Sequence, residues 1–156
     1  MISLKINDNK FFMNTLLSSE VFDIFTLKEA SLTTYLSINI DGAKPENEEN
    51  ATTQYVTFSV AKKLLFDCLR GKKLPQKFKI ILAMNDSDFK KLSQDNSLDS
   101  SPVSNYQLTI NYIEDSINII SGIAYSSFSL EKIYEKNWDN FTLSFLEKND
   151  IKYTEL

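Results

Sequence analysis

Basic side chains gather in one part of this chain, between Lys62 and Lys91, and such a cluster can bind phosphate groups or an acidic protein. The segment holds nine lysine or arginine residues and three aspartates, so it carries +6 while the other residues carry −10 of the total of −4. We predict a basic patch around one helix end, formed by Lys62, Lys63, Arg70, Lys72, Lys73 and Lys77. The alternative stays open that these lysines only solvate a helix end, where the helix dipole favours cations.

Arg70 is the only arginine, and all other basic residues are lysines. Lysine is a point charge and lacks the planar fork with which arginine binds guanine or phosphate through two hydrogen bonds. A nucleic acid held by this patch would therefore be bound through its charge rather than its base sequence.

Histidine is absent from the chain. Its absence removes the usual general base near neutral pH, the Ser-His and Cys-His nucleophile pairs and the commonest zinc ligand. The three glycines, Gly42, Gly71 and Gly122, lie too far apart for a glycine-rich phosphate loop. We therefore predict a protein that is not an enzyme, with no catalytic residue, no metal ligand and no cofactor.

Carboxylates are the remaining groups that could carry chemistry. Asp41 follows a predicted strand, and Asp86 and Asp88 follow another, so all three could converge on one edge and hold two metal ions. Turn and capping roles explain these aspartates better, because aspartate side chains bond their own backbone two or three residues on.

The cysteine content and the lack of a signal-peptide or membrane-span pattern indicate the cytoplasm. Cys68 is the only cysteine, which excludes a disulfide within the chain, and its place on an apolar helical stripe predicts a core residue. The opening MISLKI has no basic region before an apolar one, and no apolar run approaches the roughly 18 residues of a membrane span. We expect a cytoplasmic protein with no membrane contact.

The first half of the chain predicts two strand regions and two helices. Alternation predicts a strand over 1–6, and Asn7, Asp8 and Asn9 are candidate caps for a helix that ends near Glu20. A second alternating pattern predicts a strand from Leu32 to Asp41, within a longer stretch that a bend at 29–31 divides in two. The acidic segment 43–54 predicts a mobile loop, and a helix follows over 55–70 with Gly71 as its C-cap.

The second half predicts a central strand, a hairpin and the clearest amphipathic helix. The expected elements are a strand over 77–84, a short helix from Asn85 to Leu92, a polar loop over 93–104, a hairpin of 106–113 with 117–125, and a helix over 129–148 capped by Ser129. Gly122 inside a strand indicates a bulge or a close backbone approach. The tail 150–156 is expected to be loose.

This element order predicts an α+β fold, with a largely antiparallel sheet of about six strands packed by three main helices. We expect a single domain over 1–149, since the sequence contains no repeat and no linker.

Several short stretches resemble one family. They are the opening MISLKI, the F-x-x-F-x-L-x-E-A pattern over 22–30, Ile40-Asp41-Gly42, the G-K-x-x-P pattern over 71–75 with the strand after it, and Trp138-Asp139. The family is an uncharacterised set of bacterial proteins, catalogued only as a domain of unknown function. The resemblance covers nearly the whole chain and implies one domain, but it carries no activity and no site residues. The element order alone is similar to one domain of a DNA sliding clamp, in which helices that carry lysines face DNA.

We predict a non-enzymatic binding protein whose macromolecular partner is unknown, with another protein as the expected partner. The alternative is a nucleic-acid-associated protein, similar to a sliding clamp, that uses the lysine-rich patch. The oligomeric state stays open.

Overall fold

The computed structural model describes residues 1–44, 55–69, 75–94 and 102–156. Its elements in chain order are β1 Ser3–Ile6, α1 Asn9–Ser18, a 3-10 helix Val21–Ile24, β2 Phe25–Thr33, β3 Ser37–Asp41, β4 Val56–Thr57, α2 Phe58–Leu69, β5 Lys77–Met84, α3 Asp86–Gln94, β6 Val103–Ile113, β7 Ser116–Tyr125, α4 Ile133–Lys148 and β8 Tyr153–Glu155. The fold is α+β, as predicted.

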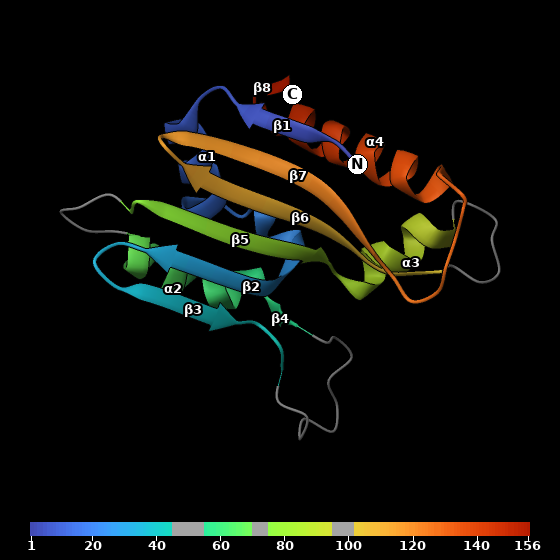
Figure 1. The fold of residues 1–156 in the computed structure, drawn as a ribbon, viewed down its shortest axis with the longest axis horizontal. Helices are drawn as coiled ribbons and strands as arrows, with labels where there is room; N and C mark the ends of the chain where they lie inside the picture. The colour runs from blue at the N-terminus through green and yellow to red at the C-terminus, as the bar shows by residue number, and fades with distance from the viewer. Residues whose placement is uncertain (45–54, 70–74, 95–101) are drawn as a thin grey trace.

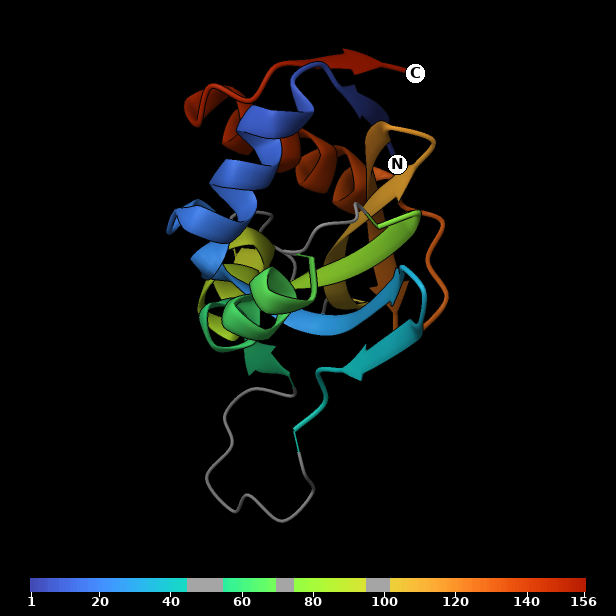
Figure 2. The same ribbon diagram turned by 90° about the vertical axis from the view of Figure 1, so that its left-hand side faces the viewer.

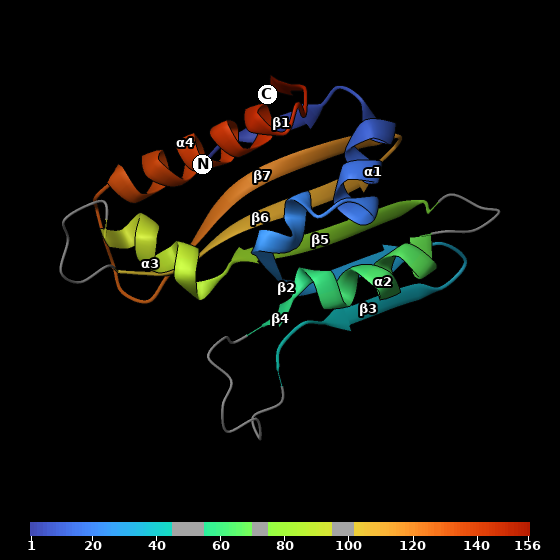
Figure 3. The same cartoon turned by 180° about the vertical axis from the view of Figure 1, so that it is seen from behind.

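The strands form one antiparallel sheet, eight-stranded over the described residues, in the order β3-β2-β5-β6-β7-β1-β8 with β4 beside β2. The two strands beyond the predicted six are the short β4 and β8. The helices α1 to α4 of the described residues lie on one face of the sheet, and no described helix covers the other, open face (Figures 1 and 2). Seen from behind, α1 and α2 cover one half of the sheet and α4 runs along β7 (Figure 3).

The core lies between the sheet and this helix layer. Alternate strand residues such as Phe25, Ile80 and Leu108 are at most 1% exposed, as expected when every second side chain faces the helices. An aromatic cluster closes the layer, in which the Phe22 ring lies 5.7 Å from that of Phe12 and 5.2 Å from that of Phe145.

The predicted strand over 32–41 is wrong, because the chain turns at 34–36 and returns as β3. Leu32 pairs with Ile38 and Thr33 with Ser37, and the amide of Thr34 bonds the carbonyl of Leu36 at 3.0 Å. Leu32 and Ile38 are six positions apart, so they would share a face in one continuous strand. They also share a face in the observed hairpin, because they lie directly opposite each other. Alternation therefore could not distinguish one long strand from a hairpin.

Gly42 follows β3 because the backbone there passes very close to β2. A Cβ atom at this position would lie 1.8 Å from the Leu27 carbonyl oxygen, and the Gly42 amide donates to the Lys28 carbonyl at 2.9 Å. Gly122, in contrast, sits in regular register opposite Gln107 and a Cβ there would meet no atom within 4 Å. The bulge or close approach predicted at Gly122 is therefore wrong.

Two predicted helices begin later than expected. Tyr55, Val56 and Thr57 pair as strand rather than helix, and α2 starts at Phe58. Ser129 is not the cap of the last helix, because α4 starts at Ile133 and residues 126–132 form a loop. In both cases apolar side chains at helical spacing also precede the first residue of the helix. Periodicity alone therefore predicted a start that is too early.

Local signals are confirmed where they were strongest. The Asp8 side chain caps α1 by accepting from the Phe11 amide at 3.0 Å, and Asn85 caps α3 by accepting from the Asp88 amide at 2.8 Å. Strand β5 spans the predicted 77–84, and β6 and β7 form the predicted hairpin. Its turn has positive φ at both Glu114 and Asp115, as a two-residue hairpin turn of type I′ requires.

Two loop predictions fall largely on residues that the structure does not describe. These are positions 45–54 of the predicted mobile loop and positions 95–101 of the predicted polar loop.

The tail, predicted to be loose, is part of the fold. Asp150 has φ of 58°, the Ile151 amide bonds the Leu146 carbonyl at 2.9 Å and the Asp150 amide bonds that of Glu147 at 3.1 Å. This is a Schellman motif, which reverses the chain after α4. It buries Ile151 to 2% exposure and brings β8 alongside β1, so the domain extends beyond residue 149.

Replacing Asp150 with glycine is expected to stabilise the protein by about 1 kcal/mol, because glycine adopts positive φ without steric cost. The measurement is urea unfolding followed by circular dichroism. Asp150→Ala is the matched control, since it removes the charge at the helix C-terminus but keeps the strained φ. A gain as large in the alanine variant would show that charge, rather than backbone conformation, limits stability here.

A candidate binding groove between two helices

Helices α1 and α2 do not cover the sheet completely, and a groove of about 890 Å³ lies between them. The residues Tyr112, Asp115 and Ile117 place it at the end of the sheet where β6 turns into β7. Its volume is within the range of about 300–1,000 Å³ typical of ligand pockets.

The groove is apolar because core residues form its floor. Phe78, 4% exposed, stacks on Tyr112 with ring centroids 5.1 Å apart, and Ile117 is fully buried. Its walls come from Phe11, Met13 and Leu17 of α1, from Phe66 and Leu69 of α2, and from Pro75. Met13 and Leu17 are one helical turn apart and therefore face the same side of α1.

The rim of the groove is polar and carries charges of both signs. Asp8, Lys10 and Asp115 all line it and are exposed. The Asn9 side-chain amide donates to the Asp115 carbonyl at 2.7 Å, which ties the start of α1 to the hairpin turn. An apolar floor with a mixed-charge rim suits a protein segment better than a polyanion.

Tyr112 lines the groove and is a titratable residue that stacks on Phe78 of the groove floor. Its hydroxyl donates to the Asp115 carboxylate at 2.8 Å. This hydrogen bond, then burial and the negative charge of Asp115, raise the pKa of Tyr112 above its usual 10.0. Because the pKa is raised only in the folded protein, the unfolded chain ionises first. The resulting stabilisation is complete below about pH 10 and is lost as the pH rises through the folded-state pKa.

We expect Asp115→Asn to lower the pKa of Tyr112, because it removes the nearby charge and leaves a weaker acceptor. Absorbance at 295 nm during alkaline titration measures tyrosinate formation. The difference between wild type and Tyr112→Phe gives the contribution of Tyr112. If that difference curve is the same in the Asp115→Asn background, the hydrogen bond does not control the titration.

A smaller hollow of about 360 Å³ extends the groove along α2 and is lined by Lys62 and Lys63. Lys62 bonds the Asp23 carboxylate at 2.8 Å and the Ser19 carbonyl at 2.9 Å, and its side chain is 16% exposed. Its charge is therefore neutralised, and it ties α2 to the segment before β2.

The predicted basic patch is not one surface among the residues that the structure describes. Lys63 is exposed on α2, in the helix layer. Lys77 alternates with the buried Phe78, so its exposed side chain lies on the open face of the sheet. Arg70, Lys72 and Lys73 fall in 70–74, outside the described residues.

The open face of the sheet carries a row of polar residues that cross-strand register aligns. The row runs from β3 to β8 through Asn39, Ser31, Lys79, Asn111, Asn118, Lys5 and Thr154. Sequence reasoning missed this row because its members are up to 149 positions apart in the chain numbering, from Lys5 to Thr154.

The candidate carboxylates do not build a metal site over the part of the chain that the structure describes. Asp41 lies opposite Glu29 and accepts from the Ala43 amide at 2.9 Å, which is the predicted turn role. Asp88 accepts from the Asn85 side-chain amide at 2.8 Å. No group of three or more Cys, Asp or Glu that could hold a metal ion occurs among these residues.

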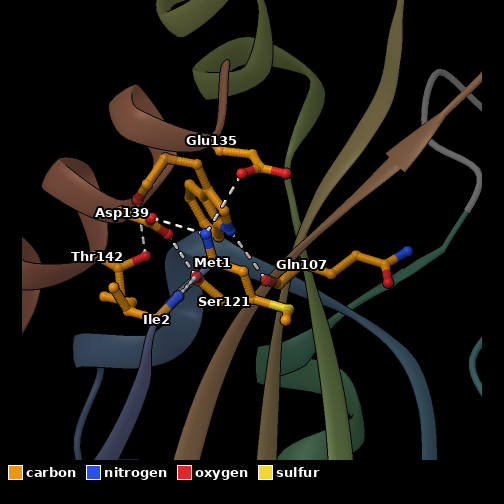
Figure 4. Close-up of polar contacts among 8 residues, drawn as sticks. Met1, Ile2, Gln107, Ser121, Glu135, Asp139 and Thr142 are labelled. Carbon is orange, nitrogen blue, oxygen red and sulfur yellow. Dashed lines mark hydrogen bonds and ion pairs between the residues drawn. The ribbon is translucent and has the colours of Figure 1, made fainter. Parts of the chain in front are cut away.

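A polar network joins α4 to β7 and to the two residues before β1 (Figure 4). Ser121 donates to Asp139 at 2.5 Å and accepts from the Ile2 amide at 2.9 Å, and the Met1 amino group bonds Asp139 at 2.9 Å. Ser121 is 1% exposed, and its hydroxyl satisfies the Ile2 amide and the Asp139 carboxylate. The neighbouring Trp138 donates to the Gln107 carbonyl at 3.0 Å, which fixes α4 over β6.

The fold and groove together define an α+β protein with an open antiparallel sheet and a helix layer that leaves an apolar groove. The model of the Family of unknown function (DUF5721) matches residues 15–154, so the chain belongs to this family. This confirms the resemblance to a family of unknown function. No curated protein and no solved structure matches the chain, so the similarity to a sliding clamp stays a prediction. None of the described helices is long and apolar enough to cross a membrane.

Proposed function

We propose that the protein is a non-enzymatic interaction module that holds an apolar segment of a partner protein in the groove between α1 and α2. The observation that carries this proposal is the groove itself, about 890 Å³ in volume and floored by the core residues Phe78 and Ile117. A site of this kind gains affinity by removing apolar side chains of the partner from water.

Exposed apolar side chains on α1 and α2 support this proposal. Phe11 is 42% exposed and Phe66 is 37% exposed, and both line the groove. Aromatic residues that stay partly exposed in the free protein are typical of the anchor positions of interfaces. The rim, with Asp8, Lys10 and Asp115, would hydrogen-bond the partner where its segment leaves the groove.

Selection from a random peptide library displayed on phage tests the proposal. We expect the selected peptides to share two or three apolar anchors and to bind at about 1–100 μM, as contacts with few anchors do. The groove variant, Phe11→Lys with Asn14→Lys, changes two exposed positions of α1 that line the groove. It should weaken binding at least tenfold in fluorescence anisotropy while circular dichroism shows an unchanged fold.

The matched control is the loop variant, Phe128→Ser with Leu130→Ser. These side chains are 86% and 85% exposed and lie outside the groove. The loop variant should bind the selected peptides as wild type does. Equal weakening in both variants, or peptides whose NMR contacts map to the open sheet face, would contradict the proposal.

A second function, nucleic-acid binding, is favoured by the lysines of the open face. Lys5, Lys77 and Lys79 are exposed there, and none has a carboxylate within 4 Å among the residues that the structure places. Binding of labelled DNA or RNA at about 50 and 200 mM salt tests this function, because phosphate contacts weaken steeply with salt. Salt-sensitive binding that Lys77→Glu with Lys79→Glu removes would support it, and no binding at low salt would exclude it.

A further inference from the structure

The loop between β7 and α4, residues 126–132, exposes two large apolar side chains. Phe128 is 86% exposed and Leu130 is 85% exposed, higher than any other large apolar residue of the described chain. The loop is anchored at its start, because both the amide and the hydroxyl of Ser126 bond the Pro102 carbonyl, at 2.7 and 3.0 Å. Near its end the Glu131 amide bonds the Ser129 hydroxyl at 3.1 Å. The two side chains therefore project from a loop that is anchored at its start and braced by one bond of its own.

This loop and the groove between α1 and α2 lie at opposite ends of the long axis of the molecule. The groove is beside the turn from β6 to β7, whereas the loop follows the far end of β7 (Figures 1 and 3). Phe128 and Leu130 cannot reach the groove of their own chain. A second copy can present them to it.

We propose that the occupant of the groove is the β7–α4 loop of a second copy of this chain, so that the protein associates head to tail. The inference rests on the proposed function, because it uses the same groove, and it names the partner. Phe128 and Leu130 would pack against the partly exposed Phe11 and Phe66 of the groove walls, which removes water from both apolar surfaces.

The charges beside the two surfaces are complementary. In the loop, Phe128 and Leu130 are followed by the exposed Glu131 and Lys132. The groove rim presents the exposed Lys10 of α1 together with two exposed carboxylates, Asp8 and Asp115. Glu131 of the loop can thus pair with Lys10, and Lys132 with Asp8 or Asp115. Such pairing fixes the orientation of a complex more than it adds affinity.

The contact is heterologous, since each copy contributes a different surface. Heterologous contacts build rings when the rotation closes and open chains when it does not. An open assembly keeps one unused groove at one end and one unused loop at the other until it closes. The protein should therefore grow beyond a dimer as its concentration rises.

Sedimentation equilibrium from about 10 to about 500 μM tests this, the range in which contacts with few anchors dissociate. We expect the average mass of the wild type to rise past that of a dimer. The loop variant and the groove variant should each stay monomeric, because each lacks one half of the contact. Circular dichroism confirms that both variants are folded.

Mixing the two variants gives the sharpest result. The loop variant retains an intact groove and the groove variant retains an intact loop, so an equimolar mixture has one productive contact per pair. We expect a dimer that contains one copy of each variant and does not grow further. A two-fold symmetric dimer through any other surface would not appear selectively in the mixture.

The inference is overturned if the wild type stays monomeric up to about 500 μM, if either variant alone assembles like the wild type, or if the mixture forms no dimer. Its failure can be told from failure of the proposed function. Selected peptides that bind the groove of a monomeric wild type would leave the groove as a site for another protein. A groove that binds neither peptides nor the loop would remove both proposals.

Discussion

Phe22→Ala is expected to destabilise the protein by about 3–5 kcal/mol, the usual cost of removing a fully buried aromatic ring. Phe22 is 0% exposed, and its ring contacts those of Phe12, Phe25 and Phe145. The ring therefore joins α1, β2 and α4, and its removal leaves a cavity among these elements. Because domains are stable by about 5–15 kcal/mol, this loss is a large fraction of the total.

Urea unfolding followed through Trp138 fluorescence measures this loss, since Trp138 is the only tryptophan and is 1% exposed. Phe128→Ala is the matched control because it makes the same chemical change at an 86% exposed position. It should shift the free energy of unfolding by less than about 0.5 kcal/mol. Similar losses in both variants would mean that Phe22 does not close the core as described.

Ile151→Ala is expected to cost about 2–5 kcal/mol, which is the range for truncating a buried aliphatic side chain. Ile151 is 2% exposed and follows the Schellman motif that reverses the chain after α4. Its apolar contact with the end of the helix is part of that motif. Losing it should also loosen β8, which pairs with β1 directly after it.

Two measurements separate these effects. Denaturant unfolding gives the global cost, and amide hydrogen exchange of Lys5 and Thr154, which lie opposite each other, reports the pairing of β1 with β8. Leu156→Ala is the control within the same tail, since Leu156 is 72% exposed. If Ile151→Ala costs no more than Leu156→Ala, the tail is not part of the cooperative fold.

The basic patch shows that a cluster of charges in the sequence does not by itself predict a charged surface. Lys62, Lys63 and Lys77 are close in sequence, but Lys62 is paired with Asp23, Lys63 is exposed on a helix and Lys77 lies on the open face of the sheet. Proximity along the chain does not keep side chains on one surface when a helix and a strand follow each other. The prediction for Arg70, Lys72 and Lys73 stays untested.

The groove was missed for the opposite reason. Its floor and walls come from α1, α2, β5 and the β6–β7 hairpin, which are far apart in the chain. The available signal was local: Phe11, Met13 and Leu17 are apolar beyond the stripe that Phe12 and Leu16 already supply. Helices with more apolar surface than one buried stripe needs can mark a second contact surface.

The sequence by itself determined the elements that short-range physics specifies. Alternating side chains defined β5 and the β6–β7 hairpin, and the side chains of Asp8 and Asn85 defined two helix starts, because a residue bonds its own neighbours there. Tertiary structure alone decided the turn at 34–36, the place of the tail beside β1 and the groove. Each of these depends on which distant strands pair and which helix faces remain uncovered. Neither can be predicted from the residues next to one another in the sequence, because both depend on contacts between distant parts of the chain.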